Sequence, residues 1–295
     1  FAGVSNGALL VAGGANFPDK KPWDGGKKVW TDRVFVLDKP DGEWKDAGKL
    51  PRPLGYGVSV SHRTGVVCVG GCDAERHSAA TFRLEWKDGK LVTTPLPSLP
   101  VTAAYLCGAL LGDDLFVAGG QEKPDSPSAL KTAYRINLGD REPKWERLAD
   151  IPGSGRMLAV SAAHAGAFWV VGGVELVPGR KYLKDAHRYD PGRGWSRVKD
   201  FPTPVAASPS PAPSDETGFF VLGGDDGSQV GVGPDKHRGF SRTVVRFDAK
   251  TGEWVPAGEL AAARVTVPCV VWGMSWVVPS GEVRPGVRSP EVWRK

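Results

Sequence analysis

Cysteine and histidine are scarce in this chain of 295 residues, which has four cysteines and five histidines. The cysteines show neither Cys-x-x-Cys spacing nor the histidine partners of a zinc site, and they are too few for a disulfide scaffold. We therefore expect no metal site, buried free thiols, and histidines that lie on the surface or in loops. The cysteines are Cys68, Cys72, Cys107 and Cys269.

Long apolar runs and a concentration of one charge are also missing. No run is long enough to span a bilayer, and no signal peptide is present. The net charge is +5, but the lysines and arginines are scattered. We therefore expect neither a membrane nor a nucleic acid as partner, while a small acidic ligand fits the charge. Oligomeric state leaves no mark on the sequence.

Glycine and proline, by contrast, are plentiful, with 39 and 25 residues. Both favour short strands joined by tight turns over helices. The hydrophobic content of 41% is sufficient for a sizeable core. These features predict an all-β fold, and we expect one domain over residues 1–295.

One pattern, an apolar run that ends in Gly-Gly, returns at intervals of about fifty residues. A small apolar strand precedes it, an alternating strand follows it, and a fourth strand usually opens with tryptophan. The doublets are Gly13-Gly14, Gly70-Gly71, Gly119-Gly120, Gly172-Gly173 and Gly223-Gly224, with a degenerate copy at 275–281, and the tryptophans are Trp44, Trp145, Trp195 and Trp254. The units resemble kelch repeats, and six of them predict a six-bladed β-propeller.

The two ends of the chain read as parts of blades. Residues 1–7 read as a first strand, and residues 290–295 as the third strand of the sixth blade. We therefore expect the last blade to lack its fourth strand. We also expect that the start at Phe1 is a processed or truncated N-terminus, and that upstream residues supply the strand.

Comparison of the repeats points to one position, two residues after the doublet. It holds Asn16, Asp73, Glu122, Glu175, Asp226 and, in the degenerate copy, Glu282. We expect these residues in the loops around the central pore, most of them as turn residues. Glu282 differs because its repeat breaks the rule and a Pro-Gly turn leads from it to Arg288. A carboxylate beside a guanidinium can accept a proton, although a solvated surface ion pair is the alternative.

Two segments resemble one known family. Residues 281–288 resemble the motif GE(I/V)(K/R)PG(L/V)R of the N-acetylneuraminate mutarotases, and residues 13–18 resemble their GGANFP segment. The first motif lies in mid-chain in the enterobacterial members of the family but at the end of this chain. In this order of motifs the chain resembles a cyclically permuted branch of the family.

The resemblance implies a function. The family's six-bladed kelch propellers interconvert the anomers of sialic acid, a small anionic sugar, without metal or organic cofactor. It implies that Glu282 accepts the proton of the anomeric hydroxyl, that Arg288 holds the substrate carboxylate, and that the protein is a periplasmic or secreted bacterial isomerase.

The repeat logic adds three substrate-binding candidates. Asn16, Asp226 and Arg156 are expected near the same face, although Arg156 can equally pair with an acidic loop residue. The main alternative function is a kelch propeller that binds a protein or carbohydrate partner without catalysis. A copper oxidase of the galactose-oxidase type is disfavoured, because no cluster of histidine and tyrosine falls in the pore loops.

Overall fold

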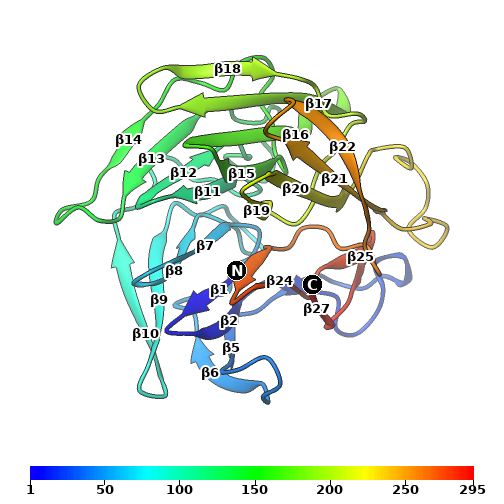
Figure 1. Cartoon of the computed structure of the whole chain (residues 1–295). Helices are drawn as coiled ribbons and strands as arrows, with labels where there is room; N and C mark the ends of the chain where they lie inside the picture. Colours follow the sequence, from blue (N-terminus) through cyan, green and yellow to red (C-terminus); the bar gives the residue numbers. More distant parts are fainter.

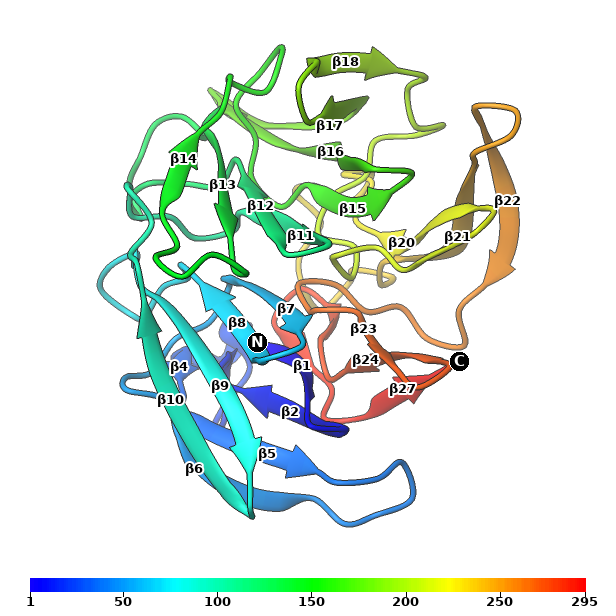
Figure 2. The same ribbon diagram turned by 60° about the vertical axis from the view of Figure 1, so that its left-hand side comes forward.

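The computed structural model describes residues 1–295. Six antiparallel sheets are arranged around a centre and follow one another in chain order (Figures 1 and 2). Five sheets have four strands, and the last has three. We call them blades 1 to 6. The predicted six-bladed propeller is confirmed.

The strands of the first three blades follow the chain without a crossover. Blade 1 consists of β1 (Ala2–Ser5), β2 (Ala8–Ala12), β5 (Arg33–Leu37) and β6 (Lys45–Lys49). Blade 2 consists of β7 (Val58–His62), β8 (Gly65–Val69), β9 (Thr81–Lys87) and β10 (Lys90–Leu96). Blade 3 consists of β11 (Cys107–Leu111), β12 (Asp114–Ala118), β13 (Ala133–Asn137) and β14 (Trp145–Arg147).

The last three blades include the sheet with three strands. Blade 4 consists of β15 (Val160–His164), β16 (Ala167–Val177), β17 (Gly179–Asp190) and β18 (Gly194–Val198). Blade 5 consists of β19 (Ser214–Asp215), β20 (Gly218–Gly224), β21 (Ser241–Asp248) and β22 (Glu253–Glu259). Blade 6 consists of β23 (Val270–Trp272), β24 (Ser275–Pro279) and β27 (Val292–Arg294). The expected end strands are present, and the source of a fourth strand for blade 6 stays a prediction.

Two small hairpins extend from loops between second and third strands. They are β3 (Ala15–Asn16) with β4 (Val29–Trp30), and β25 (Glu282–Arg284) with β26 (Val287–Arg288). The one helical segment is the 3-10 turn η1 (Pro22–Asp24). No helix in the structure has the length and apolar character needed to cross a membrane.

The glycine doublet gives room for the linker between blades. Gly13 and Gly14 have φ angles of 64° and 102°. The Gly14 N–H donates to Leu54 O in the linker at 2.7 Å, and a Cβ on Gly13 would lie only 2.2 Å from that oxygen. The first glycine therefore lets the linker carbonyl approach, which no larger residue would allow there.

Each interface between consecutive blades, from blade 1 through blade 6, contains an apolar residue from the end of the earlier blade. These residues are Leu50, Leu99, Ile151, Phe201 and Leu260. Three of the four repeat tryptophans, Trp145, Trp195 and Trp254, add a hydrogen bond to the preceding blade, as when Trp145 Nε1 donates to Pro97 O at 2.8 Å. Between blades 6 and 1, the apolar cluster of Ala2, Leu9, Leu37, Val270 and Val277 has no such residue.

The predictions for the cysteines and for the histidines had different outcomes. All four cysteines are buried free thiols, as predicted, and burial raises the pKa of Cys68, Cys107 and Cys269 to about 12. The expectation that the histidines lie on the surface or in loops was wrong for His62 and His187, which are buried in strands β7 and β17. His77 and His237 lie in loops, as expected, although both are buried. Burial lowers the pKa of His62, His77 and His187, because the charged imidazolium is poorly solvated there.

Candidate functional site

Five residues at equivalent places in the linkers between blades form a ring around the axis, which we call the axial ring. They are Tyr56, Tyr105, Leu158, Ala207 and Thr266. All five have left-handed backbone, with φ between 55° and 60°. The N–H of each of the last four donates to the carbonyl of the ring member before it at 2.8 Å. Left-handed backbone costs about 1–2 kcal/mol in such residues, and this strain is concentrated at functional sites.

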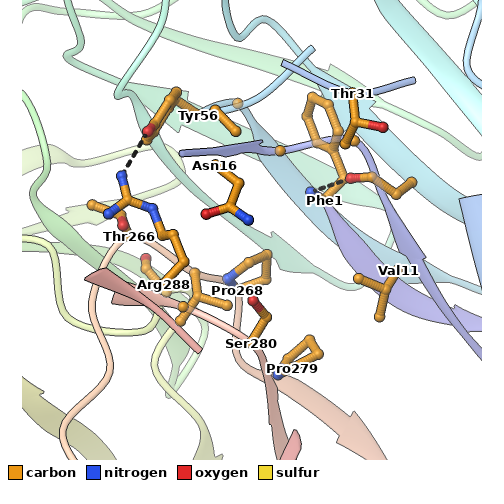
Figure 3. Close-up of a pocket in the computed structure, with 18 of the residues that line it drawn as sticks. Phe1, Val11, Asn16, Thr31, Tyr56, Thr266, Pro268, Pro279, Ser280 and Arg288 are labelled. Carbon is orange, nitrogen blue, oxygen red and sulfur yellow. Dashed lines mark hydrogen bonds between the residues drawn. The ribbon is translucent and has the colours of Figure 1, made fainter. Parts of the chain in front are cut away.

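The axial ring lines a cavity of about 910 Å³, a size that suits a small-molecule ligand. Its wall has two characters. Tyr56, Tyr105 and Leu158 give an aromatic and apolar part. Hydroxyl, amide and guanidinium groups give a polar part that consists of Asn16, Thr31, Arg33, Ser208, Ser210, Thr266, Ser280, Arg288 and Ser289. Figure 3 shows Asn16, Tyr56, Thr266 and Arg288 facing the same space.

The hairpin β25–β26 brings Glu282 and Arg288 opposite each other. Arg288 Nη1 lies 2.6 Å from Glu282 Oε1, and the two side chains are 13% and 14% exposed. The same Oε1 accepts a hydrogen bond from the Gly286 N–H at 2.6 Å. Arg288 lines the cavity, whereas Glu282 does not. The structure thus brings the two predicted residues together, with the guanidinium nearer the cavity.

Arg288 is only partly satisfied. Its Nη2 donates to Tyr56 Oη at 3.2 Å (Figure 3), while Nη1 is buried and makes no aligned hydrogen bond despite its closeness to Glu282. Burial opposes the charge, but Glu282 and Tyr56 outweigh it and raise the pKa of Arg288 above its ordinary value. The cavity wall therefore holds a permanent cation with a donor to spare, which suits a carboxylate ligand.

The structure corrects the repeat register of Glu282. Ser280 and Gly281 have φ angles of 70° and 112°, so this pair takes the conformation of the doublet. Glu282 is then one residue after the doublet, and Val283 is the residue two places after it. Like its equivalents Cys72, Gln121, Val174 and Asp225, Glu282 forms an isolated β-bridge to the linker in front of the axial ring. This inward position explains why Glu282 is more sheltered than Asn16 or Asp226.

The three other site candidates have different places. Asn16 lines the cavity, as expected, and its Oδ1 accepts a hydrogen bond from the Phe17 N–H at 2.8 Å. Asp226 is exposed, does not line the cavity, and accepts a hydrogen bond from the Ser228 N–H at 2.8 Å in a local turn. The expectation for Asp226 is therefore corrected to the turn role.

Arg156 also needs correction, because it does not line the cavity. Its side chain is fully buried and forms two hydrogen bonds to the Asp185 carboxylate, at 2.7 and 3.1 Å. Nη1 also donates to Gly172 O at 3.0 Å, beside the doublet of blade 4. Arg156 thus joins two parts of the fold and has the structural role that the sequence left open.

Sequence reasoning missed Tyr56, Tyr105 and Lys28. Lys28 Nζ lies 5.1 Å from the centre of the Tyr56 ring, which puts a second cation beside the cavity. A signal for the axial ring does exist in the sequence. In four linkers the ring residue follows the closing apolar residue by six positions: Leu50 to Tyr56, Leu99 to Tyr105, Phe201 to Ala207 and Leu260 to Thr266.

Comparison with known proteins gives matches in one family. Residues 1–93 match the sequence model of the family described as N-acetylneuraminate epimerase. The N-acetylneuraminate epimerase of Yersinia enterocolitica is 42% identical over 104 residues, which are 31% of this chain and 25% of that protein. That of Salmonella enteritidis is 40% identical over 102 residues, or 31% of this chain and 26% of that protein.

The matched part spans about a quarter of the length of these relatives. The family match includes Asn16 and Tyr56 and ends at residue 93, before Glu282 and Arg288, so the permuted order stays a prediction. Residues 1–93 of this kelch-type propeller are thus similar to the N-acetylneuraminate epimerases, a family of isomerases.

Proposed function

We propose that this protein is a sugar mutarotase that interconverts the α and β anomers of N-acetylneuraminate. The observation that carries the proposal is the cation in the cavity wall: Arg288 lines the cavity and is held there by Glu282 and Tyr56. A carboxylate-bearing sugar matches this arrangement. The match of residues 1–93 to the N-acetylneuraminate epimerase family supports the choice of sugar.

The proposed chemistry begins with the substrate carboxylate on Arg288, whose planar guanidinium suits it. Glu282 contacts Arg288 but does not line the cavity, so the proposal requires Arg288 to move toward the ligand and give Glu282 access to the anomeric hydroxyl. Oε1 is held by the Gly286 N–H, which leaves Oε2 to accept the proton. The ring then opens to the keto form and recloses on the opposite face.

Hydroxyl groups on the cavity wall supply partners for the sugar's own hydroxyls. Ser208, Ser210 and Ser280 lie on the polar part of the wall with Asn16. We also propose, from the family resemblance, that the protein acts in the periplasm or outside the cell. Fractionation of the source cells, with detection of this chain, tests that location.

The function is tested with the α anomer released by a sialidase. Proton NMR follows its conversion to the β anomer with and without the protein. We expect the protein to accelerate the approach to equilibrium in proportion to its concentration. Equal rates in the two samples would contradict the proposal.

A further inference from the structure

The proposed ring opening needs a second group, because the ring oxygen must gain a proton when its bond to the anomeric carbon breaks. Glu282 receives a proton in that step and cannot supply this one. The group must therefore be a proton donor on the cavity wall near Arg288. Tyr56 is the side chain with a hydroxyl that contacts Arg288 directly.

The phenol of Tyr56 lines the cavity and accepts a hydrogen bond from Arg288. Arg288 Nη2 donates to Tyr56 Oη at 3.2 Å, so the oxygen acts as acceptor and its own hydrogen has no acceptor in the protein. The backbone fixes this placement, because Tyr56 has a φ of 60° and its carbonyl accepts a hydrogen bond from the Tyr105 N–H at 2.8 Å. An aromatic residue in left-handed backbone is strained, which is typical of functional positions.

Two cations lie beside this phenol. Arg288 contacts its oxygen, and Lys28 Nζ is 5.1 Å from the ring centre. Both stabilise the phenolate that forms when Tyr56 gives up its proton. The phenolate then takes the proton back from the sugar hydroxyl when the ring closes, which restores the neutral phenol.

Tyr105 is a natural contrast within the same ring. Its aromatic ring is 5.0 Å from that of Tyr56, and it has the same left-handed backbone. Its hydroxyl, however, lies 4.0 Å from Cys72 Sγ rather than against a cation, and burial raises the pKa of Tyr105. The environment of Tyr105 therefore opposes loss of its proton.

We propose that Tyr56 is the residue that exchanges a proton with the ring oxygen, an assignment that rests on the proposed mutarotase function. On opening, the anomeric O–H proton passes to Glu282, and its electron pair forms the C=O bond. The bond between the anomeric carbon and the ring oxygen breaks, and that oxygen takes the proton of Tyr56. Closure on the other face of the carbonyl reverses both transfers and restores Glu282 and Tyr56.

The test compares Tyr56→Phe with the matched variant Tyr105→Phe in the NMR assay. Loss of a general acid costs about 100-fold or more, so we expect Tyr56→Phe to lower kcat by about that factor with little change in KM. Tyr105 also lines the cavity, but its hydroxyl is not the proposed proton donor, so we expect Tyr105→Phe to lower kcat far less than Tyr56→Phe does. Thermal unfolding of both variants shows that each is folded.

A second measurement covers the case in which Tyr56→Phe does not fold. Replacement of Tyr56 by 3-fluorotyrosine keeps the shape and makes the phenol more acidic. We expect the alkaline limb of the kcat profile to move to lower pH, and we expect no shift with 3-fluorotyrosine at Tyr105. An unmoved limb, or a Tyr56→Phe variant with full kcat, would overturn the role of Tyr56 alone. Absence of any acceleration by the wild-type protein would overturn the mutarotase function together with it.

Discussion

Two arginine–carboxylate pairs near the axis make an instructive comparison. Arg156 and Asp185 join through two hydrogen bonds, and the fully buried guanidinium also reaches Gly172 O. Arg288 and Glu282 are as close, yet Arg288 lines the cavity and one of its buried nitrogens makes no aligned hydrogen bond. Both pairs join an arginine to a carboxylate. The difference is that the guanidinium of Arg156 is enclosed by protein groups, whereas that of Arg288 lines the cavity, where a ligand can reach it.

The comparison predicts that removing Arg156 lowers the free energy of unfolding more than removing Arg288. Arg156→Met leaves Asp185 unpaired among buried groups, so we expect it to lower the free energy of unfolding by about 3 kcal/mol. Arg288→Met should cost about 1 kcal/mol, because Glu282 keeps the Gly286 N–H and can turn toward the cavity. Denaturant unfolding of the two variants measures both values. Equal losses would remove the distinction between a structural pair and a site pair.

Loss of a carboxylate should lower the activity when the residue is Glu282 but not when it is Asp226. Glu282→Gln keeps the size of the side chain but cannot accept the proton, so kcat for anomer interconversion should fall by about 100-fold or more. Asp226→Asn is the matched control, because the amide oxygen still accepts the Ser228 N–H in its exposed turn. The NMR assay reads both. Retained activity in Glu282→Gln, with the protein folded, would show that the proton goes to another group.

The architecture was predictable from sequence because the repeat is local. Each doublet, its two flanking strands and its tryptophan lie close together in the chain, so the six-bladed propeller and its short last blade could be read directly. Within blade 6 the same reading was wrong by one residue. Ser280 adopts the left-handed conformation of the first glycine of a doublet. The amino-acid sequence did not show that a serine takes this place.

The site was less predictable because its geometry comes from backbone rather than from residue type. The axial ring is made by left-handed residues and hydrogen bonds between linkers, so its members range from Ala207 to Tyr56. No shared letter marks them. Arg156 shows the converse, since an arginine beside a glycine-rich linker looks like a ligand-binding group until Asp185, 29 positions away, is placed against it. Glu282 and Arg288 were found because they are close in sequence and opposite each other in one hairpin.

The smallest expected effect is a dependence of the free energy of unfolding on pH. It arises beside the Arg156–Asp185 pair and not beside the Arg288–Glu282 pair. His187 is buried, with its Nδ1 3.6 Å from Asp185 Oδ2, and burial and Arg156 lower its pKa below the ordinary 6.5, although Asp185 opposes this. Below pH 6.5, His187 is protonated in the unfolded chain but stays neutral in the folded chain. The stability that is present above pH 6.5 is therefore lost as the pH falls from 6.5 toward the pKa of His187 in the folded state. Unfolding free energies measured from pH 8 to pH 5 should show this decline.

His187→Gln should reduce the slope without abolishing it, because burial also lowers the pKa of His62 and His77. Arg288→Met should leave the slope intact, since His187 and its neighbours are unchanged. An unreduced slope in His187→Gln would mean that the buried pair of blade 4 does not carry the acid sensitivity.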